Sequence, residues 1–110
     1  MDPLYYIDQI DVLISSPMVD QYLVGITCNV NSRRKDYKSR GFPFFFVLEV
    51  GLDKDNAISL EKEIFAKLVG DKKSATYKKY HHEKRDGTYH ASTGGKHSDS
   101  YFVYIAAFGS

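Results

Sequence analysis

The sequence predicts one domain of the α+β class. Its 110 residues are a length typical of a single domain. Strand-like and helix-like segments follow one another in mixed order, which favours α+β over a doubly wound α/β fold. No repeat or low-complexity linker divides the chain, so we expect one domain over residues 1–110.

The N-terminal half begins with two expected strands. Leu4–Ile14 combines tyrosine and β-branched residues with polar interruptions, and we expect one strand or two short ones there. Pro17 ends this run, and Gln21–Thr27 is the next expected strand. A short helix then runs from a cap at Asn29 to about residue 40, with Gly41 just past its end.

An apolar run and a longer helix follow. The run FPFFFVLEV does not alternate, which predicts a central strand covered on both faces. After a turn over Gly51–Asn56, Asp55 or Asn56 caps a helix over Ala57–Val69, which Gly70 ends. Asp86-Gly87 predicts a hairpin turn within a polar region, and Ser100–Phe108 is the last expected strand. The expected order is therefore β-β-α-β-α, a basic loop or hairpin, and β.

Composition limits the cellular setting. The net charge of +1 exerts no strong overall pull on nucleic acid, so basic patches must be judged locally. Cys28 is the one cysteine, which fits a reducing compartment. Residues 1–10 do not resemble a secretory signal, and no apolar stretch is long enough to span a bilayer. We expect a soluble, intracellular, cytoplasmic protein without a membrane partner.

Glu61 is out of place on the longer helix. On a helical wheel it falls within the apolar arc, with Ala57 and Phe65 four residues to either side. A carboxylate there must be paired, protonated or turned into a cleft, because burying it alone is too costly. Two interpretations stay open: a rim glutamate bridged to an arginine, and a metal ligand on the floor of a site.

The shorter helix is basic. Val30, Arg33 and Tyr37 share one of its faces, and Arg33 and Tyr37 are i, i+4 neighbours. The remaining basic residues spread around the helix: Arg34, Lys35, Lys38 and Arg40. The helix is either a solvated basic surface or a phosphate-binding element with Arg33 aimed into a cleft.

These residues together resemble the GIY-YIG family of metal-dependent DNA nucleases. Leu23-Val24-Gly25 matches the end of the family's second strand, with leucine in place of its tyrosine. Arg33 follows the glycine by eight residues, and Tyr37 stands where the family has histidine or tyrosine. Glu61 occupies the position of the catalytic glutamate. The resemblance covers about residues 11–68 and implies a small central, mostly antiparallel sheet flanked by helices.

The resemblance also implies a chemistry. Glu61 would bind one Mg²⁺ or Mn²⁺ ion on the scissile phosphate of DNA or RNA. Arg33 would stabilise the phosphate, and Tyr37 would help to activate water. The family's first-strand tyrosine should lie near Val12-Leu13, where the chain has no tyrosine.

A second interpretation follows from the missing tyrosines. The chain would then be a catalytically degenerate domain that binds nucleic acid or a protein partner. A compact inhibitor encoded by a phage or another mobile element is one form of such a module.

Two weaker signals lie towards the C-terminus. Residues 67–85 carry seven basic residues, including Lys78 and Lys79, with Tyr77 and Tyr80 interleaved. This segment is either a solvated loop or a track for a nucleic-acid backbone with tyrosines stacked on bases. The histidines are clustered but match no standard zinc spacing, so solvated loop histidines are the default: His81, His82, His90 and His97.

Overall fold

The fold, taken from a computed structural model, is of the α+β class and is described for residues 2–81 and 100–109. Its elements in these ranges are α1 (Pro3–Ile14), β1 (Gln21–Thr27), α2 (Val30–Ser39), β2 (Phe44–Leu52), α3 (Lys54–Gly70), α4 (Ala75–Lys79) and β3 (Tyr101–Phe108).

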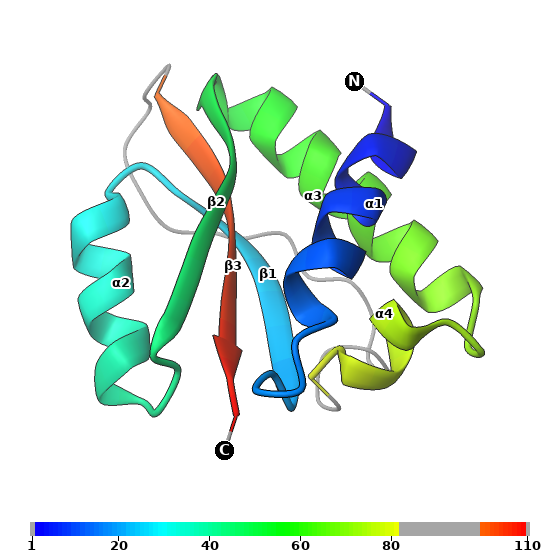
Figure 1. The fold of residues 1–110 in the computed structure, drawn as a ribbon. Helices are drawn as coiled ribbons and strands as arrows, with labels where there is room; N and C mark the ends of the chain where they lie inside the picture. The colour runs from blue at the N-terminus through cyan, green and yellow to red at the C-terminus, as the bar shows by residue number, and fades with distance from the viewer. Residues whose placement is uncertain (1, 82–99, 110) are drawn as a thin grey trace.

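The strands of the described residues form one antiparallel sheet. The strand order is β1-β3-β2, so the last strand of the chain lies between the two earlier ones. Figure 1 shows α2 on one side of this sheet and α1, α3 and α4 on the other. The predicted antiparallel sheet flanked by helices is thus confirmed at this level.

The strand expected over Leu4–Ile14 is wrong, because this segment forms helix α1. Asp2 caps the helix by accepting a hydrogen bond from the Leu4 N–H, and Pro3 stands in its first turn. Tyr6, Ile10 and Ile14 recur every four residues and are buried. This spacing places all three side chains on one helix face. Their burial on that face outweighs the strand propensity of tyrosine and isoleucine.

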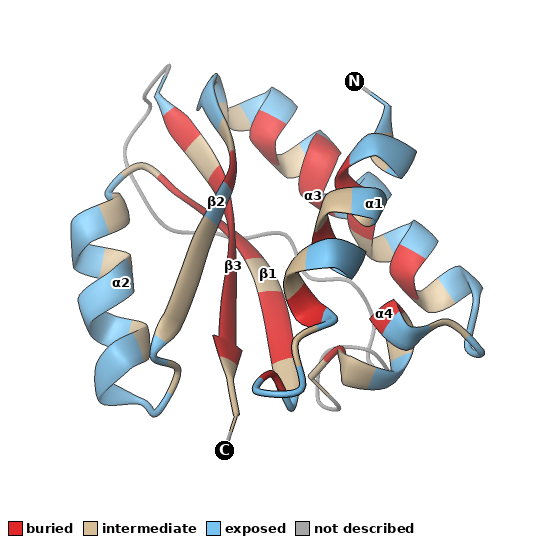
Figure 2. Ribbon diagram, in the orientation of Figure 1, coloured by how far each residue is buried: buried red, intermediate tan, exposed pale blue. Residues whose placement is uncertain are grey.

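The prediction that β2 is a covered central strand is also wrong. β2 lies at the edge of the sheet, and most of its residues are half-buried or exposed. β3 is the central strand, and residues 103–107 are all buried. Figure 2 shows β2 as largely half-buried. Its apolar run is explained instead by partial cover, since Tyr6 of α1 bonds to Glu49 and Arg34 of α2 lies over Phe45.

The helix ends follow capping chemistry. Asn29 caps α2 by accepting from the Ser32 N–H at 3.0 Å, as predicted. Gly41 has a φ of 92°, a conformation that favours glycine just past a helix. α3 begins earlier than predicted, because Asp53 caps it by accepting from the Asn56 N–H at 2.7 Å.

The main core lies between the sheet and the layer of α1 and α3. Fully buried side chains from these helices meet others from the sheet; the largest fully buried side chains are Tyr22, Tyr101, Ile10, Ile14, Leu60, Ile64, Leu68, Ile105 and Val103. α4, which the sequence did not predict, packs beside α1. The predicted turn at Asp86-Gly87 lies outside the described residues. No helix in the described ranges has the length and apolar character needed to cross a bilayer.

Candidate functional site

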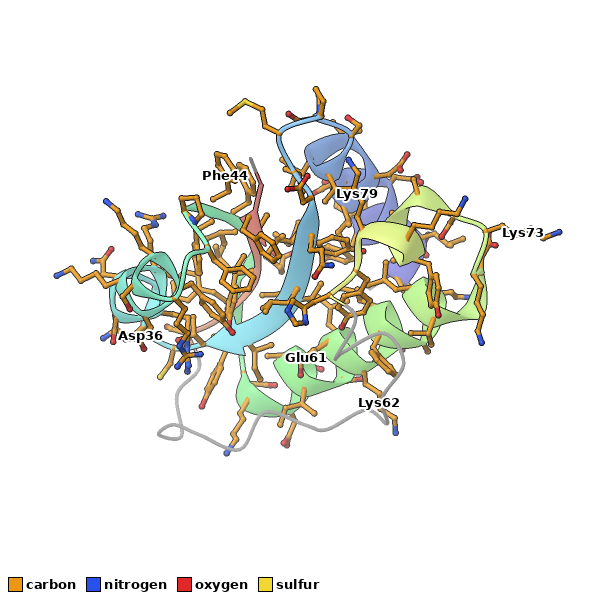
Figure 3. All side chains as sticks on the ribbon, turned by 90° about the horizontal axis from the view of Figure 1, so that it is seen from below. Asp36, Phe44, Glu61, Lys62, Lys73 and Lys79 are labelled. Carbon is orange, nitrogen blue, oxygen red and sulfur yellow. The ribbon has the colours of Figure 1, made fainter. Side chains whose placement is uncertain are left out.

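Glu61 lies on the buried face of α3. Its side chain is 7% exposed, and its neighbours on the same face are Ala57, Leu60, Ile64 and Leu68. Figure 3 shows Glu61 on the side of α3 that faces β1, whereas Lys62 points outward. The helical-wheel position is therefore confirmed: the carboxylate is inside the fold rather than on the solvent face.

Arg33 and Tyr37 lie on the inner face of α2. With Val30 they are half-buried among otherwise mostly exposed helix residues, so the predicted shared face is confirmed. Tyr37 contacts the ring of Phe42 edge-on, with 5.5 Å between ring centroids. This contact fixes Tyr37 against the sheet, with Arg33 one turn before it on the same face.

Tyr104 of β3 joins these residues at the sheet. Its hydroxyl hydrogen-bonds to that of Tyr37, with 3.3 Å between the oxygens. Its ring stacks on Phe45 of β2 at 4.8 Å. On the neighbouring strand Gly25 is its register partner, and a Cβ built on Gly25 would lie 2.5 Å from Cζ of Tyr104. The phenol therefore extends across β1 because that position has no side chain.

Three of the predicted residues affect the pKa of Tyr104: Arg33, Tyr37 and Glu61. Burial is the largest cause that raises its pKa above the usual range, and Tyr37 raises it further. The positive charge of Arg33 lowers this pKa, and the negative charge of Glu61 raises it. Both charges therefore act on the pKa of one hydroxyl, that of Arg33 from α2 and that of Glu61 from α3.

Tyr80 is a second tyrosine near Glu61. Residues 80 and 81 lie alongside β1: Tyr80 forms a parallel bridge with Tyr22, and the His81 N–H donates to the Tyr22 carbonyl at 2.8 Å. The Tyr80 ring is 4% exposed and packs edge-on against Phe65, one turn beyond Glu61. Burial raises the pKa of Tyr80, and the charge of Glu61 raises it further.

Tyr22 has a different role, although its ring stacks on Tyr80 at 5.3 Å. Its hydroxyl donates to the carbonyl of Thr76 at 2.6 Å, so it ties β1 to α4. The side chain points to the face opposite that of Leu23, as strand alternation predicts.

Sequence reasoning missed both Tyr80 and Tyr104. It expected the family's first-strand tyrosine near Val12-Leu13, where the chain has none, and α1 occupies that position instead of a strand. The available signal for Tyr104 was its place within a strongly apolar strand, since a tyrosine there needs a partner for its hydroxyl. Tyr80 is buried, so its predicted use as an exposed stacking platform for bases is wrong.

The basic residues of α2 lie mostly on its solvent side. Arg34, Lys35, Lys38 and Arg40 are exposed. Two of the guanidinium groups lie over aromatic rings at 5.4 Å from the centroid, Arg34 over Phe45 and Arg40 over Tyr37. Two arginines of α2 thus lie over aromatic rings next to the site. Contact of the basic residues of α2 with nucleic acid stays a prediction.

Lys78 and Lys79 on α4 differ from each other. Lys78 is exposed. The Lys79 ammonium donates to the carbonyls of Ile14 at 2.6 Å and Ser16 at 3.3 Å. It therefore caps the C-terminal end of α1, where a positive charge is favourable.

The described residues contain no group of three or more His, Cys, Asp or Glu side chains arranged for a metal ion. Among the described residues assigned to the site, Glu61 is the one carboxylate. A hard divalent ion fits such a site when water and substrate phosphate supply the other oxygens, as Mg²⁺ commonly requires. His81 packs between Phe42 and Phe108, and the other histidines lie outside the described residues.

Comparison of the chain with protein-family models, with curated proteins and with solved structures finds no match. The functional argument therefore depends on the geometry of the site.

Proposed function

We propose that this chain is a metal-dependent nuclease domain of the GIY-YIG type, which hydrolyses phosphodiester bonds in DNA. The observation that carries the proposal is the hydrogen bond between the hydroxyls of Tyr104 and Tyr37, at a tyrosine whose pKa also responds to the charges of Arg33 and Glu61. Three of these residues were expected from the resemblance. The fourth, Tyr104, provides a tyrosine beside Gly25, whereas the position near Val12-Leu13 has none.

Each residue has a distinct task in this proposal. Arg33 holds the phosphate by charge-assisted hydrogen bonds. Glu61 holds a divalent ion, which would neutralise charge on the phosphate and the leaving oxygen. Tyr104 and Tyr37 orient water or phosphate by hydrogen bonds. Because burial keeps the Tyr104 pKa above its usual range, its hydroxyl stays protonated at neutral pH and acts as a donor.

The test is plasmid cleavage by purified wild type, Glu61→Gln and Glu63→Gln, each with Mg²⁺, Mn²⁺ or a chelator. Glu63 is the matched control, because it is an exposed glutamate on the same helix. We expect metal-dependent nicking by wild type and Glu63→Gln, and a loss of at least about a hundredfold in Glu61→Gln. Equal cleavage by both variants would remove Glu61 from the site.

A binding module without catalysis is the second candidate. It is favoured by the same raised pKa values, since protonated Tyr80 and Tyr104 cannot serve as bases at neutral pH. The exposed cations of α2 would then hold the nucleic acid. This candidate predicts no cleavage with any divalent ion, and DNA binding that survives Glu61→Gln but weakens on Lys35→Ala.

A further inference from the structure

An apolar groove lies between α1 and β2, the strand that forms one edge of the sheet in the described residues. The groove has a volume of about 770 Å³. Its lining comes from α1 and β2: Tyr5, Asp8, Gln9, Val12, Leu13, Phe45, Phe46, Val47 and Leu48. Val12 is 72% exposed and Tyr5 59%, unusual exposure for apolar side chains that adjoin one another.

The strand beside the groove is open to pairing. In the described part of the chain, β2 has a neighbour only on its β3 side. Its outer edge therefore presents backbone N–H and C=O groups to any strand that comes alongside. Proteins usually protect such edges with charged residues, prolines or bulges. Here Pro43 precedes the strand, and the register shifts occur only after Val47, so residues 44–47 remain a regular, apolar edge.

The charges on the two sides of this edge are opposite. On the groove side, Asp8 of α1 lines the groove, and the lining includes no basic residue among the described residues. On the other side, the Arg34 guanidinium lies over the Phe45 ring. A strand paired with β2 alternates its side chains between these two sides. Complementary charge therefore requires apolar and basic side chains towards the groove, and acidic side chains towards Arg34.

A second copy of the chain does not meet this requirement. Antiparallel pairing of two β2 edges about a two-fold axis keeps each face of the sheet on the same side. It would place α1 near the partner's α1 and Arg34 near the partner's Arg34, so like charges would meet on both faces. The charge pattern therefore favours a different polypeptide.

We propose that the β2 edge and its groove bind an extended polypeptide segment of a partner protein as an added antiparallel strand. Its groove-facing side chains are apolar with a lysine or arginine at Asp8, and its opposite side chains are acidic. Backbone hydrogen bonds to residues 44–47 would supply affinity, and the groove would supply specificity. This inference does not depend on the proposed nuclease function, since none of its residues lies in the catalytic set.

The probe is a capped ten-residue peptide with valine and lysine on one face and glutamate on the other. We expect binding in the micromolar range by calorimetry, with amide shifts on β2, on α1 and around Arg34 of α2 in NMR spectra. A charge-exchanged peptide, with glutamate towards the groove, should bind at least tenfold more weakly. Asp8→Lys should largely remove this preference, because Arg34 still favours the acidic face of the first peptide, whereas Lys72→Glu, a surface change before α4, should leave it unchanged.

A further pair of peptides separates strand pairing from simple groove binding. Both have the first sequence, but each is N-methylated on alternate residues, one in the odd register and the other in the even register. Only one of the two registers blocks the N–H groups that face the β2 edge. We expect binding to be lost in one register and retained in the other. Equal binding of both registers, amide shifts that leave β2 and α1 unchanged, no binding by any peptide, or a stable dimer in sedimentation experiments would each overturn the proposal.

Discussion

The ring of Tyr104 crosses directly over Gly25 on the neighbouring strand. The two are register partners, and a Cβ on Gly25 would lie within 2.5 Å of Cζ of the tyrosine. The ring cannot easily move aside, because Phe45 stacks on it and Tyr37 holds its hydroxyl. Because Gly25 of β1 has no side chain, Tyr104 of the central strand can extend across β1 and place its hydroxyl at the candidate site.

Gly25→Ala tests this arrangement. The new methyl should displace Tyr104, with a loss of about 1–3 kcal/mol in the free energy of unfolding, as overpacked cores show. Urea denaturation measures this loss. Tyr104→Leu should relieve the clash, so the double variant should be less destabilised than the sum of the single variants. Strict additivity would mean that the ring has room to move.

Tyr80 and Tyr22 form a matched pair for a second prediction, since their stacked rings are both buried but their hydroxyls lie in different surroundings. Tyr22→Phe removes the donor to the Thr76 carbonyl and should lower the free energy of unfolding by about 1–2 kcal/mol. Tyr80→Phe should instead lower Mn²⁺ affinity about tenfold through its effect on Glu61, with a smaller change in stability.

Mn²⁺ titration followed by electron paramagnetic resonance, together with urea denaturation of both variants, checks this contrast. If Tyr22→Phe reduced metal affinity as much as Tyr80→Phe, the effect would come from the stacked pair and not from the Tyr80 hydroxyl. If neither variant changed the affinity while Glu61→Gln abolished it, Glu61 would bind the metal without help from Tyr80.

Local chemistry explains which parts of the fold the sequence predicted. Asn29 and Gly41 are end signals that act within a few residues, and they correctly delimited α2. Glu61 was identified by helical periodicity, which depends only on its own helix. α1 was missed because its tyrosines and β-branched residues have strand propensity, while the decisive spacing of Tyr6, Ile10 and Ile14 serves a tertiary contact.

The central position of β3 depends on long-range pairing. The sequence pattern of residues 101–108 is equally compatible with a strand at either edge of the sheet. No local signal in the sequence selects a position between β1 and β2. Tyr104 therefore could not be assigned to the site from the sequence, although Gly25 was. The glycine marks a close approach, but only the register identifies what approaches.

A third prediction concerns pH. The Tyr6 hydroxyl donates to a Glu49 carboxylate oxygen at 2.6 Å, which joins α1 to β2. This bond, with the Val50 N–H, lowers the Glu49 pKa despite partial burial. Burial first, then Glu49, raises the pKa of Tyr6 to about 12. Both shifts favour the pair formed by a carboxylate and a protonated phenol.

The sign follows for each group. A lowered carboxyl pKa contributes stability above its unfolded pKa of about 4.3, and this is lost as pH falls through the folded pKa. A raised phenol pKa contributes stability below about pH 10, and this is lost as pH rises towards 12. The gap in unfolding free energy between wild type and Tyr6→Phe should therefore be constant from about pH 5 to 9 and shrink outside that window. Urea denaturation across pH measures it, and a gap independent of pH would assign the loss to packing.

The last prediction separates two lysines that the sequence placed together in nucleic-acid binding. Lys79→Met removes the donor to the Ile14 and Ser16 carbonyls, so the free energy of unfolding should fall by about 1–2 kcal/mol. Its DNA affinity should depend on salt as the wild type does. Lys35→Ala, on the exposed side of α2, should leave stability unchanged and reduce the slope of log affinity against log salt by about one. Titrations between low and moderate salt, paired with urea denaturation, measure both. A reduced slope in Lys79→Met would show that the Lys79 ammonium contacts the phosphate backbone instead of the α1 carbonyls. An unchanged slope in Lys35→Ala would show that DNA does not bind along α2.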